Sequence, residues 1–221
     1  MTASTNTEMR VTVFDYGAGN LHSLVKALAL GGGYVRVETD AARAVRDTDA
    51  LVLPGVGAFA PAAACLAPGR MAMRNALHNG LPCLGICLGM QLLFDASDEG
   101  SGDGLGIIEG RVTALVAKRL PQIGWNQIDN ASEPLLAQSA LTLAYYANSF
   151  VCRPSPASVD TVTAWSEHEG DRFPAAVRRG HVVGVQFHPE KSSGPGVRFL
   201  SAFLLDAARQ RPTISIGAEH R

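Results

Sequence analysis

The sequence predicts an α/β fold built on an open, doubly wound sheet whose strands are mostly parallel. Over the first ninety-odd residues, short apolar runs of strand length alternate with longer helical segments. Strands that alternate with helices pair in parallel through right-handed crossovers. Glycine-rich turns follow three of these runs, at 17–20, 54–57 and 85–89. Because such sheets bind ligands beyond the carboxyl ends of their strands, we expect the functional site at these turns.

The individual elements follow from apolar runs and from the glycines and prolines beside them. In the first half, we predict strands over 11–15, 35–37, 49–53 and 81–86, and helices over 21–30, 58–79 (broken at 68–69) and 88–94. In the second half, we predict a loop over 97–110, strands near 112–116, 141–146, 161–165, 175–178 and 182–187, and a helix over 195–208. We therefore predict one domain over 11–208, with a flexible leader at 1–10 and a frayed tail at 209–221.

Composition excludes several classes of partner. The chain is 47% hydrophobic, which is enough for one substantial core, and its net charge is only −1. No basic run or aromatic-basic stripe is present, so neither nucleic-acid binding nor attraction to an anionic membrane is supported. The polar first ten residues do not resemble a signal peptide, and no apolar run approaches the length of a membrane span. We expect a soluble cytoplasmic protein.

Neither a metal site nor a cofactor is predicted. The four cysteines, Cys65, Cys83, Cys87 and Cys152, show no disulfide framework. Cys83 and Cys87 are too far apart for a CxxC pair, and no second Cys or His pair completes a zinc site. The glycines at 17–20 lack the third glycine of a dinucleotide fingerprint and its downstream acid, so we discount that interpretation.

Cys87 is the candidate nucleophile. It stands in Gly85-Ile86-Cys87-Leu88-Gly89, between a predicted buried strand and a predicted helix. This is the pattern of a nucleophile elbow with cysteine in place of serine, where glycines permit a sharp, strained turn. A helix N-terminus favours the thiolate there, and its backbone N–H groups face an oxyanion. The alternative is a buried structural cysteine.

A cysteine nucleophile also needs a base within hydrogen-bond reach. His188 directly follows a predicted buried strand, and Glu190 follows it past a rigid proline, where a carboxylate orients an imidazole. The alternative is a surface His-Pro turn. Similarly, the glycines of Pro54-Gly55-Val56-Gly57 either let the backbone present an N–H to an oxyanion or simply end a strand.

Together these segments resemble class I glutamine amidotransferases over nearly the whole chain. The resemblance rests on LPGVGAF (53–59), LPCLGICLGMQLLF (81–94) and GVQFHPEKS (184–192). Within the class, DYGAGNLHS (15–23), GLG (104–106) and GWN (124–126) resemble the glutaminase subunit of imidazole glycerol phosphate synthase. The resemblance implies a flavodoxin-like sheet with added antiparallel strands.

The resemblance also implies a role for each motif residue. Cys87 attacks the carboxamide of glutamine, His188 transfers protons and Glu190 orients His188. Ammonia leaves, and water then releases glutamate from a thioester. The residues implied to hold the oxyanion or the glutamine are Gly55, Val56, Gly57, Leu88, Gly89, Gln91, Ser149 and Phe150. The strand Pro54–Gly57 is expected to reorient on activation, which its glycines allow.

The implied partner is a (β/α)₈-barrel cyclase, in a one-to-one heterodimer. Ammonia passes through the barrel to a ribulosyl phosphate intermediate. The products are imidazole glycerol phosphate and an aminoimidazole carboxamide ribotide, in histidine biosynthesis. Trp125, Asn126 and Tyr145 are implied to lie at the interface. Without the resemblance, Trp125 equally fits a half-buried core indole.

Two positions depart from the family pattern. Gln122 and Asn148 stand where the family usually has histidines. Both lie outside the predicted triad of cysteine, histidine and glutamate. We therefore expect altered coupling or partner choice rather than an inactive enzyme.

Three alternatives to this assignment differ in their chemistry. Another glutaminase of the class, such as the pyridoxal phosphate synthase subunit, is disfavoured by DYGAGNL. A peptidase-like hydrolase would need a substrate cleft without a partner and would not need the His188 and Glu190 pair. A non-catalytic interaction subunit would be favoured by loss of Cys87, His188 or Glu190, and all three are present.

Overall fold

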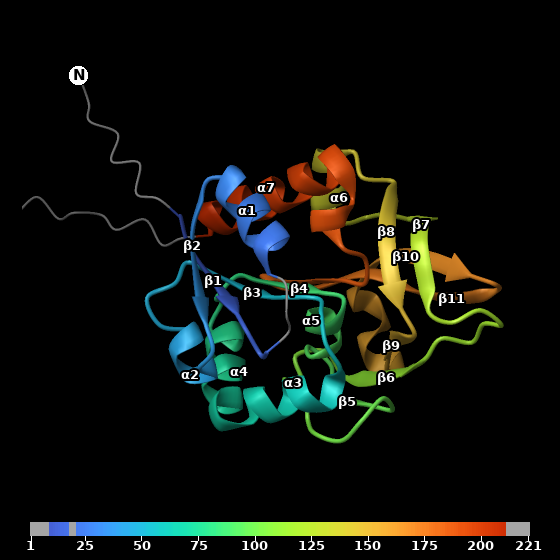
Figure 1. Cartoon of the computed structure of the whole chain (residues 1–221), viewed down its shortest axis with the longest axis horizontal. Coiled ribbons are helices and arrows are strands. Elements are labelled where there is room, and N and C mark those ends of the chain that lie inside the picture. The colour runs from blue at the N-terminus through green and yellow to red at the C-terminus, as the bar shows by residue number, and fades with distance from the viewer. Residues whose placement is uncertain (1–8, 18–20, 211–221) are drawn as a thin grey trace, which may run out of the picture.

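The computed structural model describes residues 9–17 and 21–210, so most of the predicted leader and tail and the turn at 18–20 lie outside it. Its main sheet has seven strands in the order β10-β11-β12-β4-β3-β1-β2 (Figure 1). These strands are β1 (Met9–Phe14), β2 (Gly33–Glu38), β3 (Ala50–Leu53), β4 (Cys83–Ile86), β10 (Val162–His168), β11 (Asp171–Arg179) and β12 (Val182–Val185). Five neighbouring strands of this sheet run parallel to one another: β2, β1, β3, β4 and β12. Next to β12, β11 and then β10 extend the sheet as antiparallel strands. The predicted fold class is confirmed.

Helices cover both faces of this sheet (Figure 1). One face carries α1 (His22–Leu30), α6 (Pro134–Ser139) and α7 (Ser193–Arg209), and the other carries α2 (Ala41–Ala44), α3 (Phe59–Leu66) and α4 (Arg70–His78). Strand residues alternate between the two cores, with Val52 in one and Leu51 and Leu53 in the other. Within the described ranges, no helix is long and apolar enough to cross a membrane.

Two smaller sheets lie beside the main one. The first contains β5 (Ala96–Ser97), β6 (Gly110–Ala114) and β9 (Phe150–Pro154). The second is a two-stranded antiparallel ribbon of β7 (Gln122–Gln127) and β8 (Leu143–Asn148), which we call the β7–β8 ribbon. Short 3₁₀ turns occur at η1 (Ala67–Gly69), η2 (Pro156–Thr161) and η3 (Pro189–Lys191). The break predicted at 68–69 is thus confirmed as η1.

The helix predicted over 88–94 is shorter than expected. It forms α5 (Leu88–Gln91), after which Leu93 N–H and Phe94 N–H donate to carbonyls only three residues back. The carbonyls of Leu92 and Leu93 instead accept from Leu105 and Ile107 of the following loop, at 2.7 and 2.8 Å. The chain thus tightens from α-helical to i−3 bonding after Gln91, and the loop satisfies the carbonyls that a continuing helix would otherwise have used.

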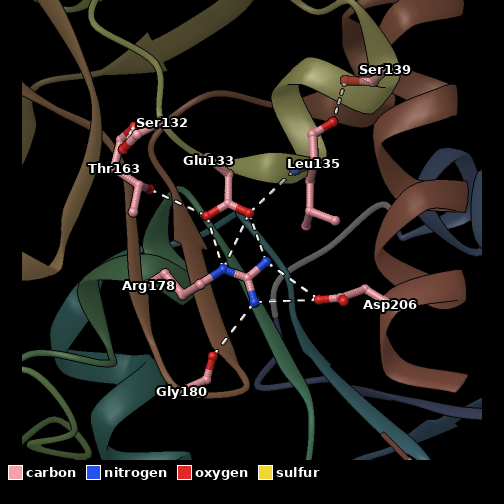
Figure 2. Close-up of polar contacts among 8 residues, drawn as sticks. All are labelled: Ser132, Glu133, Leu135, Ser139, Thr163, Arg178, Gly180 and Asp206. Atoms are coloured by element: carbon pink, nitrogen blue, oxygen red, sulfur yellow. Dashed lines mark hydrogen bonds and ion pairs between the residues drawn. The ribbon is translucent and has the colours of Figure 1, made fainter. Parts of the chain in front are cut away.

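An ion-pair network centred on the buried Glu133 joins α6, β10, β11 and α7 (Figure 2). Glu133 is the N-cap residue of α6, and its side chain is fully buried. Arg178 Nη2 and Nε donate to its two carboxylate oxygens at 2.6 and 3.0 Å. Arg178 also reaches Asp206 on α7 at 3.3 Å, and Thr163 on β10 donates to Glu133 at 3.3 Å. Burial alone lowers the pKa of Arg178, but the hydrogen bonds and charge of Glu133 outweigh it and raise that pKa.

We predict that Arg178→Met destabilises the protein by about 3–5 kcal/mol, because it leaves the Glu133 carboxylate buried without its cation. The matched control is Arg111→Met, whose partner Asp98 is half exposed and whose removal is expected to cost at most about 1 kcal/mol. Urea unfolding of both variants measures the difference. Equal losses would contradict a structural role for the network.

Candidate active site

Cys87 lies at a strained turn between β4 and α5. Its backbone has φ +46° and ψ −103°, a conformation that costs energy in a residue with a Cβ atom. The glycines on either side are required by contact. A Cβ at Gly89 would lie 2.0 Å from the Leu53 carbonyl oxygen, and one at Gly85 would lie 2.6 Å from the Gly89 carbonyl oxygen. The predicted elbow geometry is confirmed.

Strand register brings the other motifs to Cys87. Gly85 on β4 pairs with Leu53 on β3 and with Gly184 on β12. The segments that follow these three parallel strands therefore all begin at the carboxyl-end edge of the sheet. The Cys87 N–H donates to the Val185 carbonyl at 2.7 Å. Gly55 lies so close that a Cβ there would be 2.9 Å from His188 Cε1 and 3.0 Å from Cys87 Cβ. A side chain at position 55 would therefore collide with both groups.

His188 and Glu190 complete an array beside the thiol. His188 Nδ1 and Glu190 Oε1 are 2.8 Å apart, and both side chains are more than nine-tenths buried. Burial alone lowers the pKa of His188, but the Cys87 thiolate and then the Glu190 carboxylate outweigh it and raise that pKa to about 10. The imidazole therefore holds its proton at neutral pH.

One further side chain contacts this array and a second holds the neighbouring 54–57 segment, and neither was singled out from the sequence. Gln186, completely buried, places its Nε2 3.5 Å from the Cys87 sulfur. Buried Tyr16 donates its hydroxyl to the Pro54 carbonyl at the start of the 54–57 segment. Gln186 belongs to the quoted GVQFHPEKS motif, and its place one residue past β12 was the available signal. No spacing rule points from Tyr16 to Pro54.

A cavity of about 210 Å³ opens on Cys87 and His188. Its other lining residues are Gly55, Val56, Gly57, Leu88, Gln91, Glu99, Ala147, Asn148, Phe150 and Lys191. Most of the predicted oxyanion and substrate residues are thus gathered here. Among the described residues, Gly89 and Ser149 are not in this lining, and Gly89 packs against Leu53 instead.

Several polar groups of the cavity have defined partners. Gln91 Nε2 donates to the Phe150 carbonyl at 3.2 Å, and Asn148 Nδ2 donates to the same oxygen at 3.2 Å. Glu99 Oε2 accepts from the Phe59 N–H at 3.0 Å. Glu99 and Lys191 put one charge of each sign on the wall, which the sequence analysis did not anticipate. The available signal for Lys191 was its place inside the quoted GVQFHPEKS motif, whereas no local pattern pointed to Glu99.

The two family departures face each other across the β7–β8 ribbon. Gln122 pairs with Asn148, both are buried, and the Oε1 of Gln122 and Oδ1 of Asn148 have no hydrogen-bond partner in the described chain. Asn148 lines the cavity, whereas Gln122 does not. The expected change in coupling stays a prediction.

The opposite face of the ribbon is apolar and open. Ile123, Trp125 and Leu143 are 67%, 50% and 47% exposed. The Trp125 and Tyr145 rings meet edge to face with centroids 6.3 Å apart, and Lys191 Nζ lies 5.8 Å from the centroid of Tyr145. Asn126 points elsewhere, because its Nδ2 donates to the Glu167 carbonyl of β10 at 2.8 Å. We call this apolar surface the ribbon face.

The other cysteines and the acids in the described part of the chain form no second centre. All four cysteines are free thiols, and burial raises the pKa of Cys83 and Cys152. Over residues 9–17 and 21–210, no group of three or more His, Cys, Asp or Glu side chains is placed to hold a metal ion.

Comparisons with known proteins agree with this fold. The family model "Glutamine amidotransferase class-I" matches residues 12–207. The solved structure titled "Crystal structure of glutamine amidotransferase" superposes with a TM-score of 0.68, at 20% identity, over 90% of this chain and 98% of that one. The structure of PurLQS from Thermotoga maritima gives 0.67, at 18% identity, over 90% and 99%. Fold and site thus define a class I glutamine amidotransferase.

Sequence relatives narrow the assignment. Imidazole glycerol phosphate synthase subunit HisH of Symbiobacterium thermophilum is 44% identical over 213 residues, covering 92% of this chain and 99% of that protein. Subunit HisH of Gloeothece citriformis is 41% identical over 202 residues, covering 88% and 94%. The chain belongs to this imidazole glycerol phosphate synthase subunit HisH family. A chloroplastic hisHF protein of Arabidopsis thaliana is 42% identical, and the match spans 35% of its length.

The raised pKa of His188 predicts a specific pH dependence. Because the folded value of about 10 exceeds the ordinary 6.5, the ring holds a proton in the folded state that it releases on unfolding between these pH values. The contribution of the protonated His188 ring to the free energy of unfolding is therefore complete below pH 6.5 and is lost as the pH rises through about 10. In Cys87→Ala the thiolate is gone, so we predict that the pKa of His188 falls. Nitrogen NMR of the imidazole measures it, and an unchanged pKa would show that the thiolate does not act on the ring.

Proposed function

We propose that this chain hydrolyses glutamine and delivers the ammonia to a (β/α)₈-barrel cyclase that makes imidazole glycerol phosphate in histidine biosynthesis. The observation that carries the proposal is the array in which Cys87, on a strained elbow, lies beside the His188 and Glu190 pair. The chain that carries this array belongs to the HisH family. A cavity of about 210 Å³ is on the scale of one amino acid rather than of a peptide.

The chemistry follows from the positions of these groups. The Cys87 thiolate attacks the carboxamide carbon, forming a C–S bond and an oxyanion. Backbone N–H groups of the 54–57 segment and of Leu88 are the donors available to that oxyanion. His188 then gives its proton to the leaving nitrogen, so ammonia departs and a thioester remains. Water, deprotonated by the neutral His188, attacks the thioester and releases glutamate and the thiolate, while Glu190 keeps the ring oriented.

The cavity wall supplies contacts for the rest of the glutamine molecule. The Glu99 carboxylate is the acidic group suited to the α-ammonium, and Lys191 is the cation suited to the α-carboxylate. Gln91 stands one helical turn past the nucleophile, with its amide held by the Phe150 carbonyl. Glutamine therefore lies between α5, Glu99 and the chain entering β9, with its carboxamide at Cys87.

The ribbon face supports the partner assignment. It presents exposed Ile123, Trp125 and Leu143 on one surface, with the Tyr145 ring among them. Aromatic side chains of this kind are enriched at the centres of protein interfaces. Ala147 and Lys191 border both this surface and the cavity, so a partner seated here would lie next to the site where ammonia forms.

We predict that glutamate release from glutamine is low with the chain alone and rises strongly when both the cyclase barrel and its ribulosyl ligand are added. Cys87→Ala should abolish it because the attacking sulfur is gone. Cys65→Ser should not change it, since that thiol lies on the exposed side of α3. High activity that the barrel does not alter would indicate a different glutaminase, and no activity in the complex would indicate a non-catalytic subunit.

We predict that Trp125→Ala weakens binding of the cyclase barrel by about 2 kcal/mol, roughly thirtyfold in Kd, as for a central aromatic hot spot. Met71→Ala is the control, because Met71 is 56% exposed on α4, on another part of the surface. Isothermal titration calorimetry measures both affinities. An equal Kd for the two variants would move the interface away from the ribbon face.

A further inference from the structure

The peptide groups around His188 are bonded to the β7–β8 ribbon and not only to the main sheet. The His188 N–H donates to the Tyr145 carbonyl at 2.8 Å. The Ser192 hydroxyl donates to the His188 carbonyl at 2.7 Å and accepts from the Tyr145 N–H at 2.9 Å. Tyr145, His188 and Ser192 thus form a closed ring of three hydrogen bonds.

Ser192 is diverted from the role that its position predicts. It stands at the N-cap of α7, where a serine side chain ordinarily accepts from an N–H of the first helical turn. Within the described chain, the Ser192 side chain makes no such capping bond. Its one hydrogen and an acceptor site are used by His188 and Tyr145 instead.

Packing keeps Ser192 in this place. Its side chain is completely buried. Gly196, one turn into α7, comes so close that a Cβ there would lie 2.8 Å from Ser192 Cβ and 2.0 Å from the Pro189 carbonyl oxygen. The start of α7 therefore closes over the serine and leaves its hydroxyl little freedom to turn away.

The ring ends on a residue that belongs to the ribbon face. Tyr145 contributes its side chain to that face, where it meets Trp125 and Lys191. The same residue gives both of its backbone groups to the Ser192–His188 unit. A shift of β8 therefore moves the backbone of the candidate base with it.

We propose that Ser192 is a positioning residue that couples the ribbon face to His188. This inference rests on the proposed function, because it assigns the ribbon face to the partner and the proton transfers to His188. When a partner binds the ribbon face, a shift of β8 moves the His188 peptide through the Ser192 hydroxyl, and the imidazole moves with that peptide. The hydroxyl contacts no substrate atom.

The test compares two buried serines. Ser192→Ala removes the coupling hydroxyl. Ser139→Ala removes an equally buried hydroxyl that donates to the Leu135 carbonyl at 2.7 Å in α6. With the cyclase barrel and its ribulosyl ligand, we expect kcat for glutamate release to fall about tenfold in Ser192→Ala, a part of what general acid–base catalysis contributes. KM should change less than twofold, and the activity of the chain alone should fall less than the stimulated activity. Ser139→Ala should match the wild type.

A second readout does not depend on glutamine. In a Cys65→Ser background, the rate of Cys87 alkylation by iodoacetamide is measured against pH. If Ser192 positions His188, this profile shifts in Ser192→Ala and stays in place in Ser139→Ala. Should the alanine variant not fold, Ser192→Cys keeps a side chain of similar shape with a weak donor, and a smaller change in the same direction is expected.

Two results would overturn the inference. The first is equal kinetics and equal alkylation profiles in the two serine variants. The second is a proportional loss of basal and stimulated activity in Ser192→Ala without a shift of the profile. A wild-type chain that the barrel does not stimulate would refute the proposed function instead, while the alkylation profiles would still test whether Ser192 positions His188.

Discussion

The turn at Cys87 is the constraint on which the rest of the site depends. A residue with a Cβ is held at φ +46° because β4 ends there and α5 must begin at once. This turn is possible only where Gly89 packs directly on the Leu53 carbonyl and Gly85 packs on the Gly89 carbonyl. This packing fixes the register of β3 against β4, and the segment after Leu53 lies beside the thiol. The closeness of Gly55 to Cys87 and His188 is a consequence of that packing.

The candidate site is held by two different parts of the structure. The thiol depends on the parallel sheet, through the Cys87 N–H bond to Val185 and the register of β3, β4 and β12. The imidazole follows β12 as well, but its peptide is bonded to Tyr145 of the β7–β8 ribbon. Both reacting groups therefore follow adjacent strands of the main sheet, and only the backbone of His188 is also bonded to the ribbon. Their alignment depends on how the ribbon is seated, and the ribbon carries the exposed apolar face.

The sequence predicts the sheet and the array well, because both follow from local patterns. Apolar runs marked β1, β3, β4 and β12, and glycine and proline spacing marked the elbow and the histidine turn. β7 escaped prediction because QIGWNQ is half polar, and it is a strand only through pairing with β8. Glu133 escaped for a related reason: nothing local distinguishes it from a surface acid, and its partner Arg178 is 45 residues away. The same holds for Ser192, because the last helix was predicted to begin only at 195 and the partner Tyr145 lies 47 residues away.

Electrostatics explains why the array needs its enclosure. A charged imidazole is disfavoured by burial, yet His188 is buried and its pKa is about 10, since two negative groups face the ring. In water each of these pairs would be worth little, because solvent screens close charges. Enclosure by the 54–57 segment, α5 and the ribbon excludes that screening, so the groups facing the ring raise the pKa of His188 in spite of its burial. The groups that give the cavity its shape are thus also the groups that keep the His188 imidazole protonated, so packing and proton transfer at this site cannot be changed separately.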